Sequence, residues 1–327
     1  MLEFLSDKSW LAPQLNFLLH LQSVRVNCPD IINDTLKFIT TIGESFIPML
    51  ICSIYYWCIN KKDGIFLFSL FGFQYIFSQL FKMLACVYRP WILDGNIQPP
   101  ESVRIHAGGY SFPSGHSSMI SSNLGGVIAI VKNNLFRILL AAIILTVGFS
   151  RMWFGVHTPQ DVIVGLSIGI VLIFLIRPLI NYAEKNKNMY IYLLVAANIF
   201  AIFSLIYLIY FCKYPMDYDS GKLIVDPKHS LYVVLTYYGL SLGIINGICL
   251  CTRFFPFDPQ KIDLKSKILR GLIGGSMLAV THYMFFEKYI IKSLVDVKIA
   301  FIYTFLAGLF VTLIYPVICS KIKLLNK

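Results

Sequence analysis

The chain has 327 residues, of which 57% are hydrophobic and only 14% are charged, whereas an ordinary soluble domain carries roughly 25% charged residues. With a mean hydropathy of +0.69, this composition excludes a disordered chain, a coiled coil and a small disulfide-bonded module. It predicts an all-α polytopic membrane protein. The net charge of +11 does not indicate a nucleic-acid partner, because the basic residues lie in short loops between apolar segments.

A helix that crosses the core of a bilayer requires about 20 apolar residues. Nine segments meet this length approximately: residues 41–60, 64–86, 114–131, 135–152, 161–180, 190–211, 231–251, 268–286 and 299–319. We therefore expect about nine transmembrane helices. Before them, the stretch from Trp10 to Val26 has the amphipathic character of a helix that lies along the membrane interface.

The basic residues are distributed unequally between the two sets of loops that these segments define. One set (61–63, 132–137, 177–189, 252–270 and the tail after 319) carries 15 Lys and Arg and four acidic residues, and the other carries 13 of each. Basic loops remain in the cytoplasm. We therefore expect a cytoplasmic C-terminus and an N-terminus on the outside, in a bacterial inner membrane.

Three polar clusters interrupt the apolar pattern, all on the side with no net charge. In the first, Lys82 and Arg89 are seven residues apart and Pro90 follows. Seven residues are two helical turns, so the two cations are expected on one helix face, with the helix ending at Pro90. Such a pair suits an oxyanion, although side chains that snorkel from a helix end would give the same pattern.

The second cluster is Pro113-Ser114-Gly115-His116, directly before an apolar segment. Pro and Ser are typical of a helix start, and Gly115 allows a ligand to approach the backbone closely. The free N–H groups of a first helical turn bind anions. His116 would stand at the edge of that site, able to exchange a proton near neutral pH. A plain helix cap with a surface histidine is the alternative.

The third cluster runs from Ser150 and Arg151 to His157 and Asp161. His157 and Asp161 are four residues apart and would share a face of a helix, or meet across a turn, since Pro159 lies between them. In either case the carboxylate can hold one ring N–H and leave the other nitrogen as an electron pair for nucleophilic attack. Arg151 adds a forked cation suited to phosphate.

Together the clusters contain cations, two histidines and a helix start, and no set of carboxylates or Asp and His residues suited to magnesium or zinc. These are the components of phosphoryl transfer without a metal or other cofactor.

At these positions the chain resembles the type 2 phosphatidic acid phosphatase superfamily. Its three-part signature matches at every fixed position, in order and in spacing: Lys82-x6-Arg89-Pro90, Pro113-Ser114-Gly115-His116 and Ser150-Arg151-x5-His157-x3-Asp161. The resemblance implies a six-helix core, His157 as the nucleophile, Asp161 as its orienting residue and His116 as the general acid. It implies a phosphate cradle formed by Lys82, Arg89, Ser114, Gly115 and Arg151.

The apolar pattern and the resemblance together divide the chain into an interfacial segment (1–40), a phosphatase core (41–185) and additional transmembrane helices (186–327). In the last part, Asn246 and His282 are the main polar residues within apolar segments. A neighbouring helix can satisfy such residues, or they can line a substrate path.

A site at the ends of membrane helices is open to a lipid phosphate, and the aromatic residues around the motifs suit an interfacial belt. Membrane lipids are therefore the expected partners, and a phosphorylated lipid is the expected substrate. The alternatives are a polyprenyl diphosphate, a sugar phosphate as for the related glucose-6-phosphatase, and a transporter or lipid translocase that retains a phosphatase-like site. The sequence does not indicate an oligomeric state.

Overall fold

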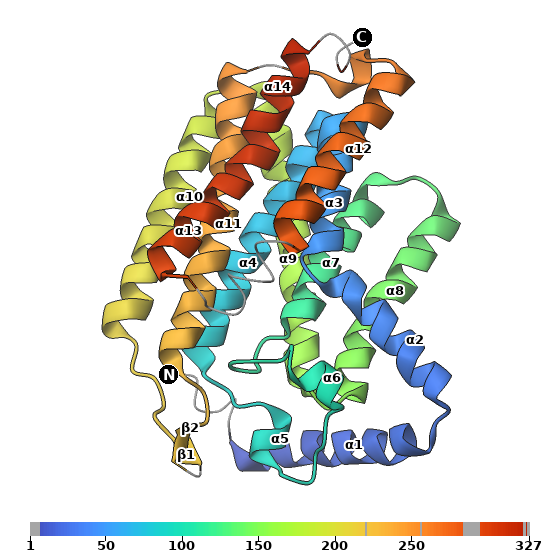
Figure 1. The fold of residues 1–327 in the computed structure, drawn as a ribbon, viewed down its shortest axis with the longest axis vertical. Helices are drawn as coiled ribbons and strands as arrows, with labels where there is room; N and C mark the ends of the chain where they lie inside the picture. Colours follow the sequence, from blue (N-terminus) through green and yellow to red (C-terminus); the bar gives the residue numbers. More distant parts are fainter. Residues whose placement is uncertain (1–6, 220, 256, 284–294, 323–324, 326–327) are drawn as a thin grey trace. The chain divides into compact units, whose positions relative to one another are not determined.

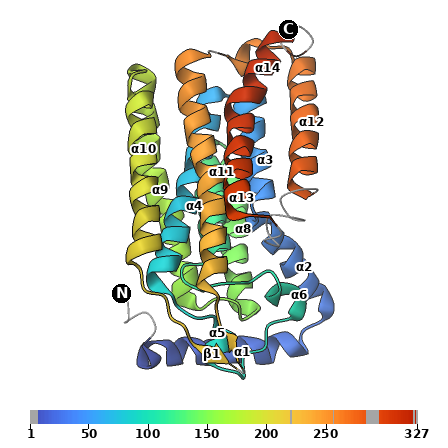
Figure 2. The same cartoon turned by 60° about the vertical axis from the view of Figure 1, so that its left-hand side comes forward.

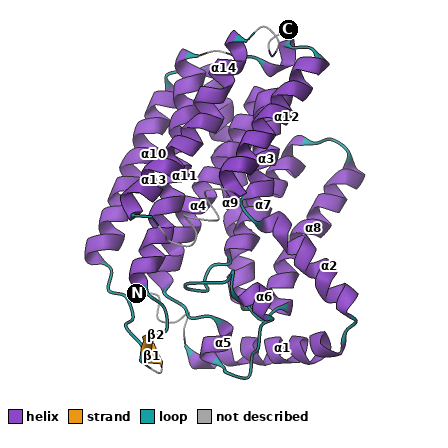
Figure 3. Ribbon diagram, in the orientation of Figure 1, coloured by secondary structure: helices purple, strands orange, loops and turns teal. Residues whose placement is uncertain are grey.

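The computed structural model describes residues 7–219, 221–255, 257–283, 295–322 and 325. This part of the chain is almost entirely helical, and its only strands form one short hairpin, β1 (Tyr218–Asp219) with β2 (Lys222–Leu223) (Figure 3). The main helices are α1 (Lys8–Asn27), α2 (Asp30–Thr40), α3 (Phe46–Ile54), α4 (Lys61–Ala85), α7 (Gly115–Ile130), α8 (Asn134–Trp153), α9 (Pro159–Lys185), α10 (Met189–Ile206), α11 (Pro227–Phe254), α12 (Leu264–Thr281) and α13 (Val297–Leu309). The prediction of an all-α protein is confirmed.

Six helical spans in the described residues are long and apolar enough to cross a membrane. They are Lys61–Leu93, Asn134–Trp153, Pro159–Lys185, Met189–Phe211, Pro227–Phe254 and Val297–Lys321. For the predicted segment 114–131 the structure has α7, which is only 16 residues long. Segment 268–286 corresponds to α12, and residues 284–286 lie outside the described chain. The total of nine therefore stays a prediction.

The predicted segment 41–60 is not one straight helix. A 3-10 turn, Thr41–Gly43, ends α2, and α3 begins at Phe46 after a bend of 52° between Asp30–Gly43 and Phe46–Ile59. The bend begins beside Gly43, where a Cβ atom would lie 3.0 Å from Val147 Cγ1 and 3.3 Å from His116 O. Gly43 therefore allows the chain to pass close to the start of α7.

By their contacts, the described residues form two compact units. Unit 1 contains Met1–Glu44, Phe77–Val171 and Tyr207–Leu231, and unit 2 contains Ser45–Ile76, Leu172–Ile206 and Tyr232–Lys327. Helices α4, α9 and α11 contribute residues to both. All of the predicted site residues belong to unit 1.

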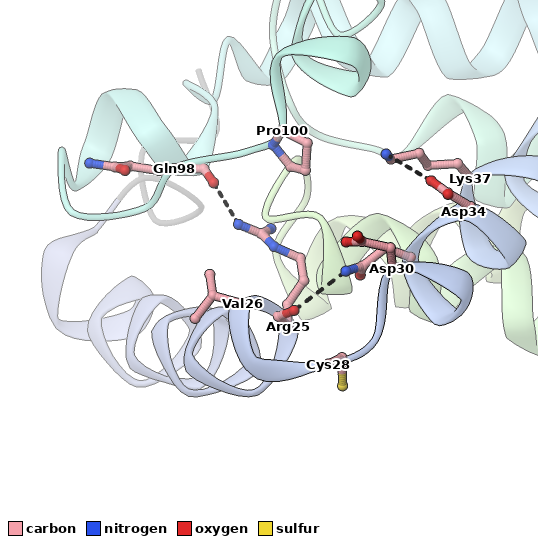
Figure 4. A pocket seen from close by; sticks show the side chains of 9 residues that line it. Arg25, Val26, Cys28, Asp30, Asp34, Lys37, Gln98 and Pro100 are labelled. Carbon is pink, nitrogen blue, oxygen red and sulfur yellow. Dashed lines mark hydrogen bonds and ion pairs between the residues drawn. The ribbon is translucent and has the colours of Figure 1, made fainter.

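Within unit 1, helices α1 and α2 contact α8, and Figure 1 shows α1 running across the end of α8. Leu18 and Leu21 of α1 pack with Phe154 and Val156 in one apolar cluster. The buried Arg25 is the polar part of this contact, since its Nη1 donates to Trp153 O (3.0 Å) and its Nη2 to Gln98 O (2.6 Å, Figure 4). The N-terminal helix is thereby fixed to the segment that carries the third motif.

A close approach of α7 and α9 positions the site from within unit 1. A Cβ atom on Gly165 would lie 2.6 Å from Ser114 O, and one on Gly169 would overlap Ser121 Oγ and the amide of Ser122. Two glycines four residues apart let helix backbones approach closely, as at membrane helix interfaces. This contact brings the start of α9 beside the start of α7.

Within unit 2, helices α11 and α13 lie side by side (Figure 2). One face of α11 carries three glycines, Gly239, Gly243 and Gly247. At this face the helix backbone approaches residues between Phe301 and Thr312 closely. Tyr56 OH and Trp57 Nε1 also donate to the carbonyls of Thr312 (3.0 Å) and Val311 (2.8 Å). These carbonyls belong to a π-helical turn, where a wide backbone leaves acceptors that side chains can use.

Asn246 is satisfied by a neighbouring helix, as one of the two interpretations expects. Its amide and that of Asn198 on α10 donate to each other (3.2 and 3.0 Å). The His282 ring packs against the Phe46 ring in a tilted arrangement, with ring centroids 5.1 Å apart. Both contacts lie within unit 2 and hold its helices together.

Candidate active site

The first motif does not form the continuous helix that its spacing predicts. Helix α4 ends at Ala85, Cys86 has a φ of 52°, and Arg89 has an extended backbone at the start of a short helix, Pro90–Leu93. Lys82 and Arg89 therefore do not share a helix face. They meet because the chain turns at Cys86 and returns Arg89 toward the end of α4.

Lys82 holds the loop before α7. Its Nζ donates to three backbone carbonyls, those of Tyr110 (2.9 Å), Ser111 (3.2 Å) and Pro113 (3.0 Å). Three acceptors use all three protons of an ammonium group. In this state Lys82 shapes the backbone that leads to Ser114, and it places a positive charge behind it.

Arg89 connects three parts of the site. Its Nη2 donates to Gly108 O (2.9 Å), its Nη1 to Val156 O (3.0 Å), and Nη1 also lies 2.8 Å from His157 Nε2. Arginine has only donors, so Nε2 accepts this hydrogen bond and carries no proton. The contact thus identifies Nε2 as the nitrogen with the free electron pair.

The second motif starts α7 as predicted. Ser114 is the N-cap, and its Oγ accepts hydrogen bonds from the amide and the hydroxyl of Ser117 (3.3 and 2.8 Å). A Cβ atom on Gly115 would meet nothing within 4 Å, so the protein leaves open space in front of the first turn. The positive end of the helix dipole and its free N–H groups make such a space suitable for an anion.

His116 follows at the edge of this space. Its side chain is half-buried, and its own backbone and Cβ pack against Gly43. Within the described residues its ring makes no hydrogen bond that would fix its proton. A ring in this position can exchange a proton with a bound phosphate, because the negative charge of the phosphate stabilises the protonated ring against burial and the neighbouring cations.

The third motif forms a turn rather than one helical face. Helix α8 ends at Trp153, Gly155 has a φ of 67°, and α9 begins at Pro159. The amides of Val156 and His157 both donate to Arg151 O (3.1 and 3.3 Å). Of the two arrangements that the sequence allows, the structure has the turn.

This turn places the His157 ring against the start of α9. His157 Nδ1 lies 3.3 Å from Ser111 Oγ and 3.4 Å from Asp161 Oδ2. Asp161 Oδ2 also accepts hydrogen bonds from Ser111 Oγ (2.5 Å) and the Thr158 amide (2.8 Å). His157 and Asp161 form a catalytic-type dyad, and both are almost completely buried. The dyad is therefore shielded from bulk water.

Arg151 has a buried hydrogen-bond donor that no group in the described chain accepts. The residue is 3% exposed, and its Nη1 donates to Thr40 Oγ1 (3.1 Å). Its buried Nε has no hydrogen-bond partner in the described chain. A buried, unpaired donor is costly, so a guanidinium in this state is a strong binder for an oxyanion.

The electrostatics of the site favour a neutral nucleophile. Burial lowers the pKa of His157 well below 6.5, and the positive charges of Arg89, Lys82 and Arg151 and the ring of His116 lower it further. A neutral imidazole retains the electron pair that an attack on phosphorus requires. The groups that lower this pKa come from all three motifs.

Three residues at this site are not indicated by sequence reasoning. Ser111 contacts both members of the dyad, the Thr158 amide binds Asp161, and Thr40 binds Arg151. Ser111 lies only two residues before Pro113 and could be suspected from that position. Thr40 is more than 100 residues from Arg151, and no local pattern marks it.

The aromatic residues near the motifs differ in exposure. Tyr110, Phe112, Trp153 and Phe154 are buried, with at most 7% of their surface exposed, whereas Tyr88 and Trp91 are half-buried. The four buried residues are core residues of unit 1, and the interfacial belt stays a prediction.

A polar cavity of about 340 Å³ lies elsewhere in unit 1, and Figure 4 shows it from close by. It is lined by residues of α1 and α2 and by the loop at 98–100, among them Asp30 and Lys37. None of the residues predicted for the active site lines it. The motif residues lie outside this cavity.

The geometry defines a phosphoryl-transfer enzyme: a neutral imidazole with an unprotonated nitrogen, next to an anion-binding helix start and several cations. Comparison with known proteins gives the family. The model of the PAP2 superfamily matches residues 63–185, and that of the PAP2 superfamily phosphatase transmembrane extension matches residues 235–327. The chain belongs to the PAP2 superfamily, and it is an integral membrane phosphatase.

Three relatives illustrate the similarity. Phosphatidylglycerophosphatase B of Bacillus subtilis is 30% identical over 171 residues, which cover 48% of this chain and 78% of the relative. The undecaprenyl-diphosphatase of Sulfolobus acidocaldarius is 29% identical over 117 residues, covering 36% of this chain and 54% of the relative. The lipid A 4'-phosphatase of Porphyromonas gingivalis is 26% identical over 124 residues, covering 38% of this chain and 52% of the relative. No solved structure matches the chain.

Proposed function

We propose that this phosphatase hydrolyses a lipid phosphate through a phosphohistidine at His157, without a metal ion. The observation that carries the proposal is the hydrogen bond between Arg89 Nη1 and His157 Nε2 (2.8 Å), which leaves Nε2 as the unprotonated nitrogen of a buried ring. The lipid class is supported by the names of the three relatives, each of which acts on a lipid.

The phosphate binds in front of the first turn of α7, in the space beside Gly115. The first-turn N–H groups and the Arg151 Nε donate to its oxygens, and Arg89 moves its donor from His157 Nε2 to a phosphate oxygen. The charge that develops on these oxygens in the transition state is thereby stabilised by donors already in place. Lys82 contributes its positive charge and the shape of the loop.

In the first step, His157 Nε2 attacks phosphorus in line with the leaving oxygen. The phosphorus–oxygen bond breaks, its electron pair stays with the oxygen, and His116 in its protonated form gives that oxygen a proton. The alcohol of the lipid leaves, and a phosphohistidine remains.

In the second step, a water oxygen attacks phosphorus while His116, now neutral, takes a proton from the water. The bond between Nε2 and phosphorus breaks, and its electron pair returns to the ring. Inorganic phosphate leaves, and Asp161 keeps the imidazole oriented through both steps.

The three-part division of the chain and its orientation belong to the same proposal. Residues 1–40 form the interfacial segment, 41–185 the phosphatase core and 186–327 the additional helices. The site faces the extracytoplasmic side of a bacterial inner membrane, with the N-terminus outside and the C-terminus in the cytoplasm. This orientation is supported by the excess of basic residues in the loops opposite to the site.

A phosphate-release screen in detergent tests the proposal. The panel contains phosphatidic acid, phosphatidylglycerol phosphate, an undecaprenyl diphosphate and glucose 6-phosphate, each with wild type and His157→Ala. We expect release from a lipid substrate by the wild type only. Equal release by both proteins would contradict the role of His157, and release from glucose 6-phosphate alone would contradict the lipid class.

A further inference from the structure

Ser111 is the residue that joins the nucleophile to its carboxylate. It is completely buried, with an Oγ that lies within hydrogen-bonding distance of Asp161 Oδ2 (2.5 Å) and of His157 Nδ1 (3.3 Å). Its backbone is held as well, because its N–H donates to Val87 O (2.7 Å) and its carbonyl accepts from Lys82 Nζ (3.2 Å). These backbone hydrogen bonds therefore fix the position of the hydroxyl beside the dyad.

The chemistry of the three groups fixes where the protons lie. An ionised carboxylate only accepts, and a serine hydroxyl has one proton and two acceptor positions. Asp161 Oδ2 accepts hydrogen bonds from Ser111 Oγ and the Thr158 amide, so the Ser111 proton points to Oδ2. A lone pair of Ser111 Oγ then faces His157 Nδ1, and Nδ1 must carry the ring proton.

The opposite side of the ring requires the same tautomer. Arg89 can only donate to Nε2, which leaves the single proton of a neutral ring on Nδ1. The Nδ1 proton faces two acceptors at nearly equal distance, Ser111 Oγ (3.3 Å) and Asp161 Oδ2 (3.4 Å). Asp161 is therefore not the only group that faces this side of the ring.

We propose that Ser111 is a positioning residue that presents His157 as the Nδ1–H tautomer and holds the Asp161 carboxylate in place, so that Nε2 points at phosphorus. This inference rests on the proposed function of His157 as the nucleophile. Ser111 does not contact the phosphate. It acts through the imidazole, as the groups behind metal-bound histidines do.

The test compares Ser111→Ala with Ser111→Thr, which keeps the hydroxyl. Phosphatidic acid in detergent micelles is the probe, and kcat and KM are measured separately. For Ser111→Ala we expect kcat to fall by about 10-fold to 100-fold, the range for groups that orient a catalytic ligand from behind. KM should change by less than about twofold, and Ser111→Thr should recover most of the loss.

Ser122→Ala is the matched control. Ser122 is also completely buried in unit 1, but its Oγ donates to Met119 O (3.0 Å) inside α7, away from the dyad. We expect its kcat to stay within about twofold of wild type. Size-exclusion chromatography of every variant shows whether it folds as the wild type does.

A double-mutant cycle with Asp161→Ala separates positioning from a structural role. If Ser111 acts through the dyad, Ser111→Ala should cost less than about threefold in the Asp161→Ala background. An equal loss in both backgrounds, an unchanged kcat in Ser111→Ala, or a rise in KM without a fall in kcat would overturn the inference. Full activity of His157→Ala would instead overturn the proposed function, and this inference with it.

Discussion

Arg89 Nη1 lies 2.8 Å from His157 Nε2, so the nitrogen assigned to attack phosphorus accepts a hydrogen bond from this guanidinium. The same Nη1 donates to Val156 O, and Nη2 donates to Gly108 O. Arg89 thus orients the nucleophile and stabilises two loops at once. An incoming phosphate must attract this guanidinium before His157 can react.

Arg89→Lys tests the forked shape of this contact. A lysine keeps the charge, but a single ammonium cannot reach Gly108 O, Val156 O and His157 Nε2 in the geometry of a guanidinium. We expect kcat/KM to fall by roughly 10²-fold to 10³-fold, the range for loss of a transition-state donor. The melting temperature should also fall, because loop hydrogen bonds are lost. Activity near that of wild type would contradict the assignment.

The pH dependence of kcat/KM tests the charge of His157. Its pKa lies well below 6.5, so the ring is neutral at neutral pH and becomes protonated, and inactive, only in acid. Removing the positive charge in Arg89→Gln should raise this pKa and move the acid limb to higher pH. The ionisation of the substrate, near pH 6 for a phosphate ester, is the same for both proteins and cancels in the comparison. A limb that stays in place or moves to lower pH would contradict the electrostatic argument.

Alanine substitutions at two glycines near Ser114 are expected to cause different defects, one in stability and the other in substrate binding. Gly165→Ala would press a methyl group against Ser114 O, at 2.6 Å, so we expect both the melting temperature and kcat to fall. Gly115→Ala meets no protein atom within 4 Å, so the fold should keep its melting temperature while the methyl group occupies the phosphate space and raises KM. Thermal unfolding and steady-state kinetics of both variants check this contrast. Equal melting temperatures for the two variants would show that the approach of α7 and α9 is not tight.

The response to a chelator tests the metal-free mechanism. The guanidinium groups of Arg89 and Arg151 and the start of α7 provide the positive charge that a metal ion supplies in many phosphatases. We therefore expect full phosphate release after treatment with EDTA and dialysis. Loss of activity that returns with magnesium or zinc would show that a metal takes part.

Cysteine labelling tests the proposed orientation. Lys132 lies in the loop between α7 and α8 and Lys222 in the β1–β2 hairpin, and both are exposed. In a background with Cys28 and Cys212 replaced by serine, we expect an impermeant maleimide to label Lys222→Cys in intact cells. Lys132→Cys should need permeabilised cells. The reverse pattern would invert the topology.

Much of the site follows from the spacing of its motifs. The helix start at Ser114, the pairing of His157 with Asp161 and the convergence of Lys82, Arg89 and Arg151 are present in the structure. These features depend on local capping, on short sequence distances and on residue types that suit one chemistry. The all-helical fold follows from apolar segments long enough to span a bilayer.

Other features depend on tertiary contacts that a local pattern does not contain. The prediction that Lys82 and Arg89 share a helix face is wrong, because the chain turns at Cys86. The φ of 52° at Cys86 is rare for a residue other than glycine. Thr40 reaches Arg151 only because α2 packs on α8. Gly43 likewise meets residues that are distant in sequence, Val147 and His116, and the composition of segment 41–60 does not indicate this contact.

The partners of Lys82 are main-chain oxygens, those of Tyr110, Ser111 and Pro113. A main-chain oxygen is present whatever side chain a residue carries, so this anchor does not depend on the identity of the side chains in the loop. The loop sequence can consequently diversify through evolution wherever core packing allows, while the backbone template under the phosphate is preserved. Loss of the lysine itself has no such remedy, because no exchange of a nearby side chain recreates an ammonium at the centre of three carbonyls.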